Sequence, residues 1–218
     1  AVEATRMGAH DFIEKPLSLA KLLLTVEQAL QSRKQQASPD GHALAAQLIA
    51  EPIGKSTVMQ ALREQVQQMA GHTAPVLLLG EAGSGINITA FYLHNCSETS
   101  GLYRELWLAS LDEEQAAREL FGYEEKGKVY PGLLEQTAHG SLLLNDIDAL
   151  DASNQSRLNS ALNNNHFKRI GGSASIKLST RLISASHANL DERVKNNEFS
   201  ADLFYRLNTL PLPLPALR

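Results

Sequence analysis

Hydrophobic positions along residues 57–214 follow two alternating patterns. Short runs of mainly apolar residues predict strands, and longer segments with apolar residues three and four apart predict helices. The predicted strands are Val76–Leu79, Glu105–Ala109, Ser141–Leu144, Arg181–Ala185 and Leu210–Leu214. The predicted helices are Thr57–Met69, Asn87–Asn95, Glu113–Leu120, Gln155–Leu162, Leu190–Asn196 and Ser200–Leu207. Since strands without a polar face need cover on both sides, the alternation favours an α/β fold with a parallel sheet core flanked by helices.

The first fifty residues have a different pattern. A short strand is expected at Asp11–Ile13, and Ser18 is placed to cap a helix that ends near Leu30. Residues 31–41 are polar and contain the breaker cluster Ser38-Pro39-Asp40-Gly41, which indicates a linker, and a weak helical pattern follows at Ala43–Ala50. We therefore divide the chain into residues 1–30, a linker over 31–50, and a larger unit over 51–218.

Composition narrows the possible classes of protein. The chain is 43% hydrophobic and 20% charged, which is ordinary for a globular protein, and its apolar runs are too short to cross a bilayer. Its single cysteine, Cys96, excludes an internal disulfide framework and a cysteine metal site, so we expect a cytoplasmic protein that does not contact membranes. The net charge of −4 gives no indication of a nucleic-acid-binding surface.

A glycine-rich turn follows the first of the main predicted strands. Residues 80–87 read Gly80, Glu81, Ala82, Gly83, Ser84, Gly85, Ile86 and Asn87. This is the layout of a P-loop, in which backbone N–H groups and a helix N-terminus hold phosphates. Ile86 and Asn87 stand where a working loop has lysine and a hydroxyl residue, so the backbone cradle is expected to remain while the cation is lost.

Several further segments, in the same order, resemble the AAA+ domain of NtrC-type, sigma-54-dependent transcription activators. They are Ile53-Gly54-Lys55-Ser56, Glu119-Leu120-Phe121-Gly122, Gly132-Leu133-Leu134-Glu135, Ala138-His139-Gly140-Ser141-Leu142, and Phe199 to Asn208. The resemblance covers residues 51–218 and implies an AAA+, P-loop NTPase-like fold, truncated before the helical lid. Residues 8–30 are similar to the end of a receiver domain, so residues 1–30 would be its C-terminal part. Residues 8–16 resemble its last strand, in which Lys15 would contact the phosphoryl group.

Four positions depart from the chemistry that this resemblance implies. Ile86 replaces the lysine of the phosphate-binding loop. Asn145-Asp146 replaces the Asp-Glu pair with which the family's Walker B motif ends, after the predicted strand Ser141–Leu144. His187 replaces a sensor asparagine, and Ser200 replaces the first arginine finger. Phosphoryl transfer depends mainly on positioning and charge stabilisation, so each loss removes part of the machinery. We expect weak ATP or ADP binding and poor Mg²⁺ binding by Asn145 and Asp146.

Asp146 and Arg206 remain as vestigial catalytic groups, with Arg206 in the position of a second finger. Asp146 and Asp148 are interpreted as solvated or structural carboxylates, and His187 as a hydrogen-bonded polar residue at a strand end. The family also has a long loop with a Gly-Ala-Phe-Thr-Gly-Ala tip that grips the sigma factor. Here residues 123–131 are shorter and lack that tip, as in the NtrX branch.

The resulting hypothesis is a two-component response regulator of transcription of the NtrC/NtrX type. Its degenerate AAA+ module would serve oligomerisation or nucleotide sensing rather than ATP-driven remodelling of sigma-54 polymerase. The family implies a homo-oligomer, a sensor histidine kinase, RNA polymerase, and DNA bound through a domain outside this chain. Three alternatives stay open: a weak ATPase using Asp146 and Arg206, a binding module for another nucleotide held by charged residues (Arg104, Arg169 and Arg181), and a decayed gene without function.

Overall fold

The computed structural model describes residues 51–215. The predictions for residues 1–30, including Lys15, and for the linker at 31–50 lie outside the described residues. The described part is built on a five-stranded parallel sheet with the order β2-β5-β8-β1-β9. Its strands are β1 (Val76–Leu79), β2 (Tyr103–Trp107), β5 (Ser141–Asn145), β8 (Arg181–Ser186) and β9 (Leu210–Pro213). The predicted α/β sheet is therefore confirmed.

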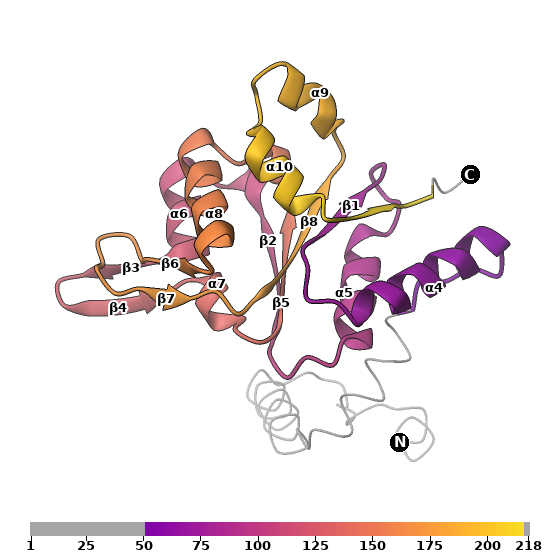
Figure 1. The fold of residues 1–218 in the computed structure, drawn as a ribbon, viewed down its shortest axis with the longest axis horizontal. Coiled ribbons are helices and arrows are strands. Elements are labelled where there is room, and N and C mark those ends of the chain that lie inside the picture. The colour runs from indigo at the N-terminus through magenta and orange to yellow at the C-terminus, as the bar shows by residue number, and fades with distance from the viewer. Residues whose placement is uncertain (1–50, 216–218) are drawn as a thin grey trace, which may run out of the picture. The chain divides into compact units, whose positions relative to one another are not determined.

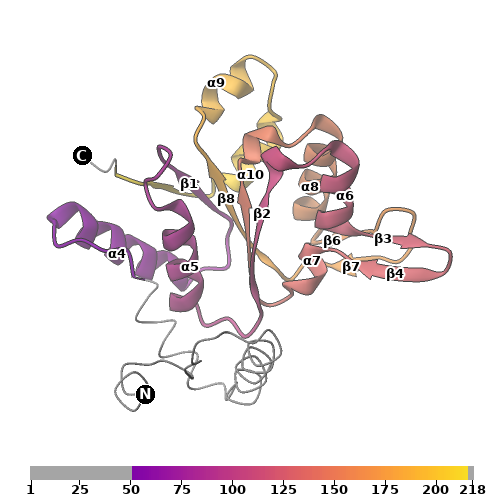
Figure 2. The same cartoon turned by 180° about the vertical axis from the view of Figure 1, so that it is seen from behind.

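Helices cover both faces of this sheet (Figures 1 and 2). On one face α4 (Thr57–Ala70) and α5 (Ile86–Cys96) enclose a core with the alternate strand residues Val76, Leu78, Leu143 and Ile183. On the other face α6 (Glu113–Phe121), α8 (Ala152–Asn164) and α10 (Ala201–Leu207) enclose a core with Leu77, Leu142, Leu144 and Leu182. The three inner strands β1, β5 and β8 are buried along their length because each side faces a helix layer.

Side-chain caps fix the starts of the helices. Ser56, Asp112, Asp151 and Ser200 each accept a hydrogen bond from the backbone N–H three residues ahead, at the first turns of α4, α6, α8 and α10. Asn189 does the same for the short helix α9 (Leu190–Lys195). Since a capping oxygen satisfies an N–H that has no intrahelical partner, these residues set the helix boundaries.

Two small antiparallel hairpins extend beyond the main sheet. The first pairs β3 (Gly122–Glu125) with β4 (Lys128–Pro131), and its turn residues Lys126 and Gly127 both have positive φ. Such a two-residue turn matches the twist of paired strands and leaves no room for a longer tip. The second pairs β6 (His166–Phe167) with β7 (Ile176–Lys177). The short helix α7 (Leu133–Gln136) follows the first hairpin, and single-turn 3-10 helices lie at Leu108–Ser110 and Ile147–Ala149.

Some predicted boundaries were wrong. The strand expected at Glu105–Ala109 runs instead from Tyr103 to Trp107. It ends two residues early because Leu108–Ser110 forms a 3-10 helix. The helix expected from Gln155 begins at Ala152, directly after its cap Asp151. At its other end α8 stops where Asn165 adopts a left-handed conformation.

Candidate functional site

The phosphate-type loop, residues 80–85, connects β1 to α5. Gly83 and Gly85 have φ of 83° and 87°, a region that favours glycine, and a side chain added at either would meet nothing within 4 Å. Gly85 begins α5 without a side-chain cap, and the first helical bond runs from Thr89 N to Gly85 O at 2.9 Å. The N–H groups of the first turn therefore have neither an intrahelical partner nor a side-chain cap, the arrangement that binds anions.

Ile86 does not extend toward this open space. Its side chain is 4% exposed and belongs to the core between α5 and the sheet, with Val76, Leu78 and Ala90. A lysine in this position would supply a mobile ammonium ion above the loop. The isoleucine supplies packing instead, so this position contributes to stability rather than to phosphate recognition.

The side chain of Asn87, the next residue, is held by a neighbouring strand. Its Nδ2 donates to Glu105 Oε2 at 2.7 Å, and Tyr103 Oη donates to Glu105 Oε1 at 2.9 Å. Burial raises the pKa of Tyr103, and the charge of Glu105 raises it further, so the phenol stays protonated and keeps donating. Glu105 was not among the predicted site residues. Its only signal was a carboxylate inside a predicted strand.

Asn145 ends β5 and Asp146 follows it, at the same carboxyl edge of the parallel sheet as the loop after β1. Asn145 is 3% exposed, and its Nδ2 is buried without a hydrogen-bond partner. Asp146 has a left-handed backbone, with φ of 54°, which aspartate tolerates. Asp148 is tied to the fold: Ser186 Oγ donates to its Oδ1 at 2.7 Å, and Arg193 approaches Oδ2 at 3.5 Å. The structural interpretation of Asp148 is thus confirmed.

His187 follows β8 at the same edge of the sheet. Its Nδ1 donates to the carbonyl of Gly80 at 2.8 Å, so the residue at the sensor position is fastened to the start of the loop. This confirms the interpretation of His187 as a hydrogen-bonded polar residue at a strand end. Ser200, at the first finger position, acts as the cap of α10 through its Oγ and carries no charge.

Arg206 lies at the opposite edge of the sheet from the loop. It lines a cavity of about 920 Å³ together with residues at the amino-terminal ends of strands, among them Pro75, Gly140 and Arg181. Asp146 instead follows the carboxyl end of β5. Within one chain the structure therefore does not bring the two vestigial catalytic residues together.

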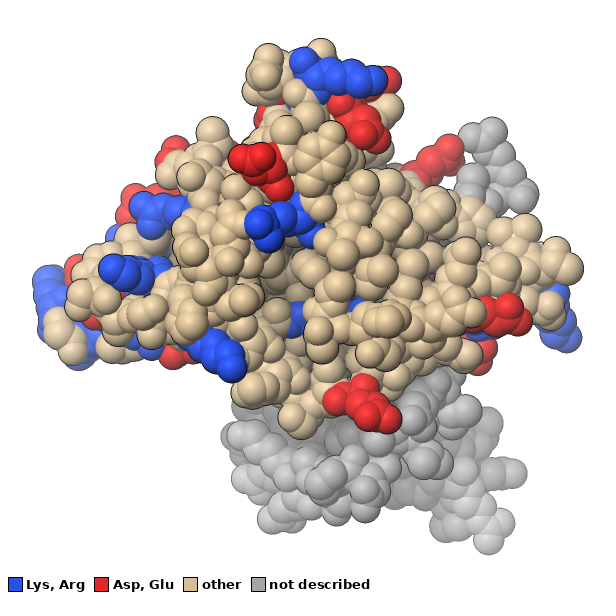
Figure 3. Space-filling model, in the orientation of Figure 1, with Lys and Arg blue, Asp and Glu red and all other residues tan. Residues whose placement is uncertain are grey.

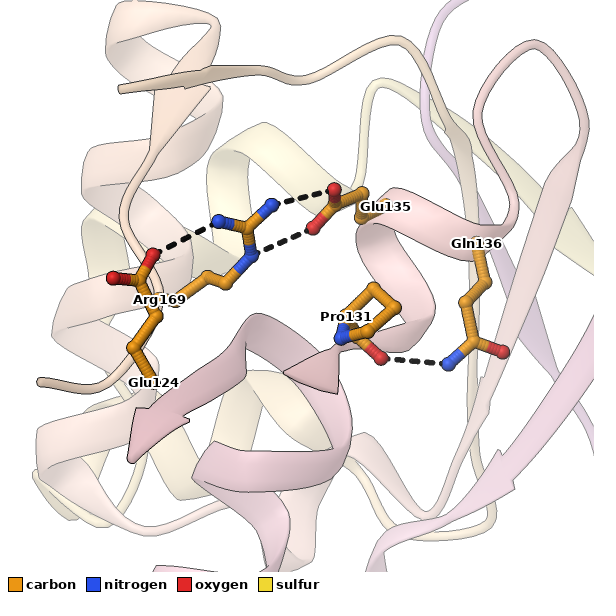
Figure 4. A network of polar contacts seen from close by, with 5 residues as sticks. All are labelled: Glu124, Pro131, Glu135, Gln136 and Arg169. Atoms are coloured by element: carbon orange, nitrogen blue, oxygen red, sulfur yellow. Dashed lines mark hydrogen bonds and ion pairs between the residues drawn. The ribbon is translucent and has the colours of Figure 1, made fainter. Parts of the chain in front are cut away.

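Arg169 and Arg181 make structural contacts away from the phosphate-type loop, which argues against them as ligands of a nucleotide bound there. Arg169 pairs with Glu135 at 2.6 Å and with Glu124 at 2.9 Å, linking the segment after β6 to α7 and β3 (Figure 4). Arg181, at the start of β8, donates to Met69 O at 2.8 Å at the end of α4. Arg104, the third of these arginines, lies on the edge strand β2.

The residues of the site fit the phosphate chain of a nucleotide, but they do not fit the Mg²⁺ ion that accompanies it. The glycine turn and the free N–H groups of α5 fit a phosphate chain. The site lacks the lysine, and it has an amide at Asn145 in place of a carboxylate metal ligand. Within residues 51–215 no group of three His, Cys, Asp or Glu residues is placed to hold a metal ion. In the same range no helix is long and apolar enough to cross a membrane.

Comparisons with known proteins agree with this geometry. The chain is 32% identical over 224 residues to the DNA-binding transcriptional regulator NtrC of Proteus hauseri, covering 100% of this chain and 47% of the relative. It is 31% identical over 227 residues to the nitrogen assimilation regulatory protein NtrX of Azorhizobium caulinodans, covering 100% and 48%. The chain thus spans about half the length of the relatives it matches.

Solved structures give the same result. A crystal structure of NtrX from Brucella abortus in complex with ADP matches with a TM-score of 0.75 and 31% identity, over 100% of this chain and 49% of that one. A second structure of that protein, in complex with ATP, matches equally well over 99% and 47%. The P-loop NTPase domain of a sigma-54 activator from E. coli, at 22% identity, matches over 76% of this chain and 100% of that one with a TM-score of 0.53, which shows the shared fold alone.

The model of the Sigma-54 interaction domain matches residues 52–213, most of the chain. The sequence motifs, the parallel sheet, the loop at its edge and these relatives all point to one assignment. The chain belongs to the sigma-54 interaction domain family, the AAA+ domain of NtrC- and NtrX-type transcription activators.

Proposed function

We propose that this chain is part of a two-component response regulator of transcription in which the AAA+ module has lost ATP hydrolysis. The module holds nucleotide phosphates weakly through the backbone of residues 80–87 and serves oligomerisation or nucleotide sensing. In the whole protein, a receiver domain answers to a sensor histidine kinase, and a domain outside this chain contacts DNA. By the same resemblance, the protein acts in the cytoplasm on RNA polymerase.

One observation carries this proposal: the side chain of Ile86 is packed in the core at 4% exposure, where the family's lysine would face the phosphates. Removing one preorganised donor of this kind typically costs about 10²–10³ in rate. The amide of Asn145 and the cap role of Ser200 remove two further charges. The backbone N–H donors of residues 80–87 do not depend on these side chains. The module can therefore keep phosphate binding although it has lost ATP hydrolysis.

Two further observations support parts of the proposal. NtrX from Brucella abortus, a relative with the same fold, has been crystallised with ADP and with ATP, which supports retained nucleotide binding. The β3–β4 hairpin closes residues 122–131 with a two-residue turn. Such a hairpin has no extended tip to grip a sigma factor, which supports a module that does not act as a remodelling motor.

Calorimetry tests the binding mode. ATP and ADP are titrated into the 218-residue chain with and without Mg²⁺. We expect weak binding of equal strength in both conditions, because Asn145 provides no carboxylate for the metal. Gly83→Asp places a carboxylate in the phosphate cradle and is expected to abolish binding, since like charges repel.

Gly127→Asp is the matched control, because Gly127 also has positive φ and open space but lies in the turn of the β3–β4 hairpin. It should bind nucleotide as the unmodified chain does. Tighter ATP binding in Mg²⁺ would contradict the loss of the metal site. Unchanged binding in Gly83→Asp would show that the loop is not the nucleotide site.

A further inference from the structure

Charge is distributed unevenly along this chain. All 24 Asp and Glu residues lie outside residues 152–190, which include α8, both strands of the second hairpin and β8. The same stretch carries five basic residues: Arg157, Lys168, Arg169, Lys177 and Arg181. The overall charge of −4 therefore conceals a segment with only positive charge, and overall charge is a poor guide to this surface.

Three of these basic residues have no carboxylate partner within the described part of the chain. Arg169 is neutralised by Glu124 and Glu135, and Arg181 is enclosed by backbone carbonyls, whereas Arg157, Lys168 and Lys177 make no ion pair there. Figure 3 shows separate blue groups over the side of the molecule that carries α8 and the two hairpins, with little red between them. These cations are free to meet an anion.

A pocket of about 450 Å³ lies between α8 and the β6–β7 hairpin. Arg157 comes from α8, His166 from β6, and Lys168 from the residue directly after β6. Hydroxyl groups of Ser156, Ser160 and Ser175 line the same space, and no Asp or Glu does. Cations and hydroxyl donors without a carboxylate form the donor set that proteins use for phosphate groups.

We propose that this pocket and the basic surface around it bind the phosphate backbone of a single-stranded nucleic acid. Lys177 lies beyond the pocket, opposite His166 in the hairpin register. Lys126 and Lys128 lie at the turn of the first hairpin, where Glu125 is 3.8 Å from Lys126 and opposite Lys128, so they contribute less than Lys177. A small phosphate ligand would use the pocket alone. An extended strand uses cations in succession, as in positively charged grooves that follow a backbone.

This site is separate from the phosphate-type loop and from the DNA-binding domain outside this chain, so its failure would leave the proposed function standing. The main chains of the two hairpins are joined, because Glu124 N donates to Ile170 O and Ile170 N donates to Gly122 O. Their cations are thereby carried on one connected structure. The basic surface therefore needs no rearrangement to meet a strand.

Fluorescence anisotropy with a labelled single-stranded DNA of about 12 nucleotides tests the proposal. We expect the full chain to bind it, with affinity that falls as salt rises. The double variant Arg157→Ser/Lys168→Ser should weaken binding about tenfold or more and lower the salt slope by about 1.4, since each phosphate contact on a single strand contributes about 0.7.

Lys55→Ser/Lys195→Ser is the matched control, because it removes two exposed charges outside residues 152–190. It should change affinity much less than the pocket variant, and the melting temperatures of both variants should stay near that of the unmodified chain. Equal effects of the two double variants would overturn the proposal. Competition by inorganic phosphate or a mononucleotide as strong as that by the oligonucleotide would also overturn it, because the pocket would then serve a small ligand.

Discussion

At the residue scale, a buried guanidinium organises the amino-terminal edge of the sheet. Arg181 donates to Met69 O at the end of α4 and to Ser97 Oγ just beyond α5. Burial lowers the pKa of Arg181, and the negative ends of the two helices offset part of that cost. His94, in the last turn of α5, lies close enough for this charge to affect it, and its Nδ1 contacts Ser141 Oγ at 3.0 Å.

His94 is expected to make stability depend on pH. Burial lowers its pKa, and the charge of Arg181 lowers it further, so the folded chain keeps the imidazole neutral. The unfolded chain has the ordinary pKa of about 6.5 and binds the proton first. The free energy of unfolding should therefore fall as pH drops through about 6.5. Urea unfolding between about pH 8 and pH 5.5 measures this fall.

His94→Gln should remove part of that pH dependence, whereas His72→Gln, at an exposed position just after α4, should leave it unchanged. If the His94 variant lost stability with falling pH as steeply as the unmodified chain, the titration of another group would be responsible. The comparison needs no assumption about the absolute stability of either variant.

At the element scale, Arg169 links β3, β6 and α7, which are two to four residues long and bury few apolar side chains. Its guanidinium joins the segment after β6 to Glu124 of β3 and Glu135 of α7 (Figure 4). The hydrogen bonds to both glutamates raise the pKa of Arg169, with the one to Glu135 the stronger influence. Figure 4 also shows Gln136 Nε2 donating to Pro131 O, at 2.7 Å, which fastens α7 to the end of β4.

Arg169→Met should lower the free energy of unfolding by about 1–3 kcal/mol, because it leaves two half-buried carboxylates without their donor. Arg118→Met is the control. Arg118 is more exposed, pairs with Glu114 on the same helix and lies 4.6 Å from the ring centre of Tyr123, so its loss should cost about 0.5–1 kcal/mol. Urea unfolding compares them, and equal costs would contradict the anchoring role of Arg169.

The elements differ in how much of them the sequence could reveal. Strands β1, β5 and β8 are buried on both faces, and β9 is a short run of leucine and proline; the positions of all four were predicted within one residue. The edge strand β2 mixes Arg104 and Glu105 with apolar residues, so its position was missed by two. The hairpins were missed because they are short and polar, and because Arg169 joins residues distant in the sequence. The loop at 80–85 was predicted because its glycines are a local sequence signal, whereas the contact of Asn87 with Glu105 depends on tertiary structure.

At the scale of the whole molecule, the altered catalytic positions are spread over separate elements. Ile86 begins α5, Asn145 ends β5 and Ser200 caps α10, so each substitution is embedded in a different part of the packing. Groups that act together in catalysis give strongly non-additive effects when they are removed one at a time. Reversal of a single position should therefore restore little.

We expect Ile86→Lys, Asn145→Asp and Ser200→Arg, each alone, to leave phosphate release from MgATP at background. One donor is worth about 10²–10³ in rate and an arginine finger about 10³–10⁵, and each acts only when the others are in place.

Ser200→Arg also removes the cap of α10, at a cost of about 0.5–2 kcal/mol. Ser56→Arg, which removes the corresponding cap of α4, controls for that loss of stability. A phosphate-release assay on the three variants decides the matter: hydrolysis restored by Ile86→Lys alone would show that the rest of the catalytic site is intact and that this module lacks only one charge.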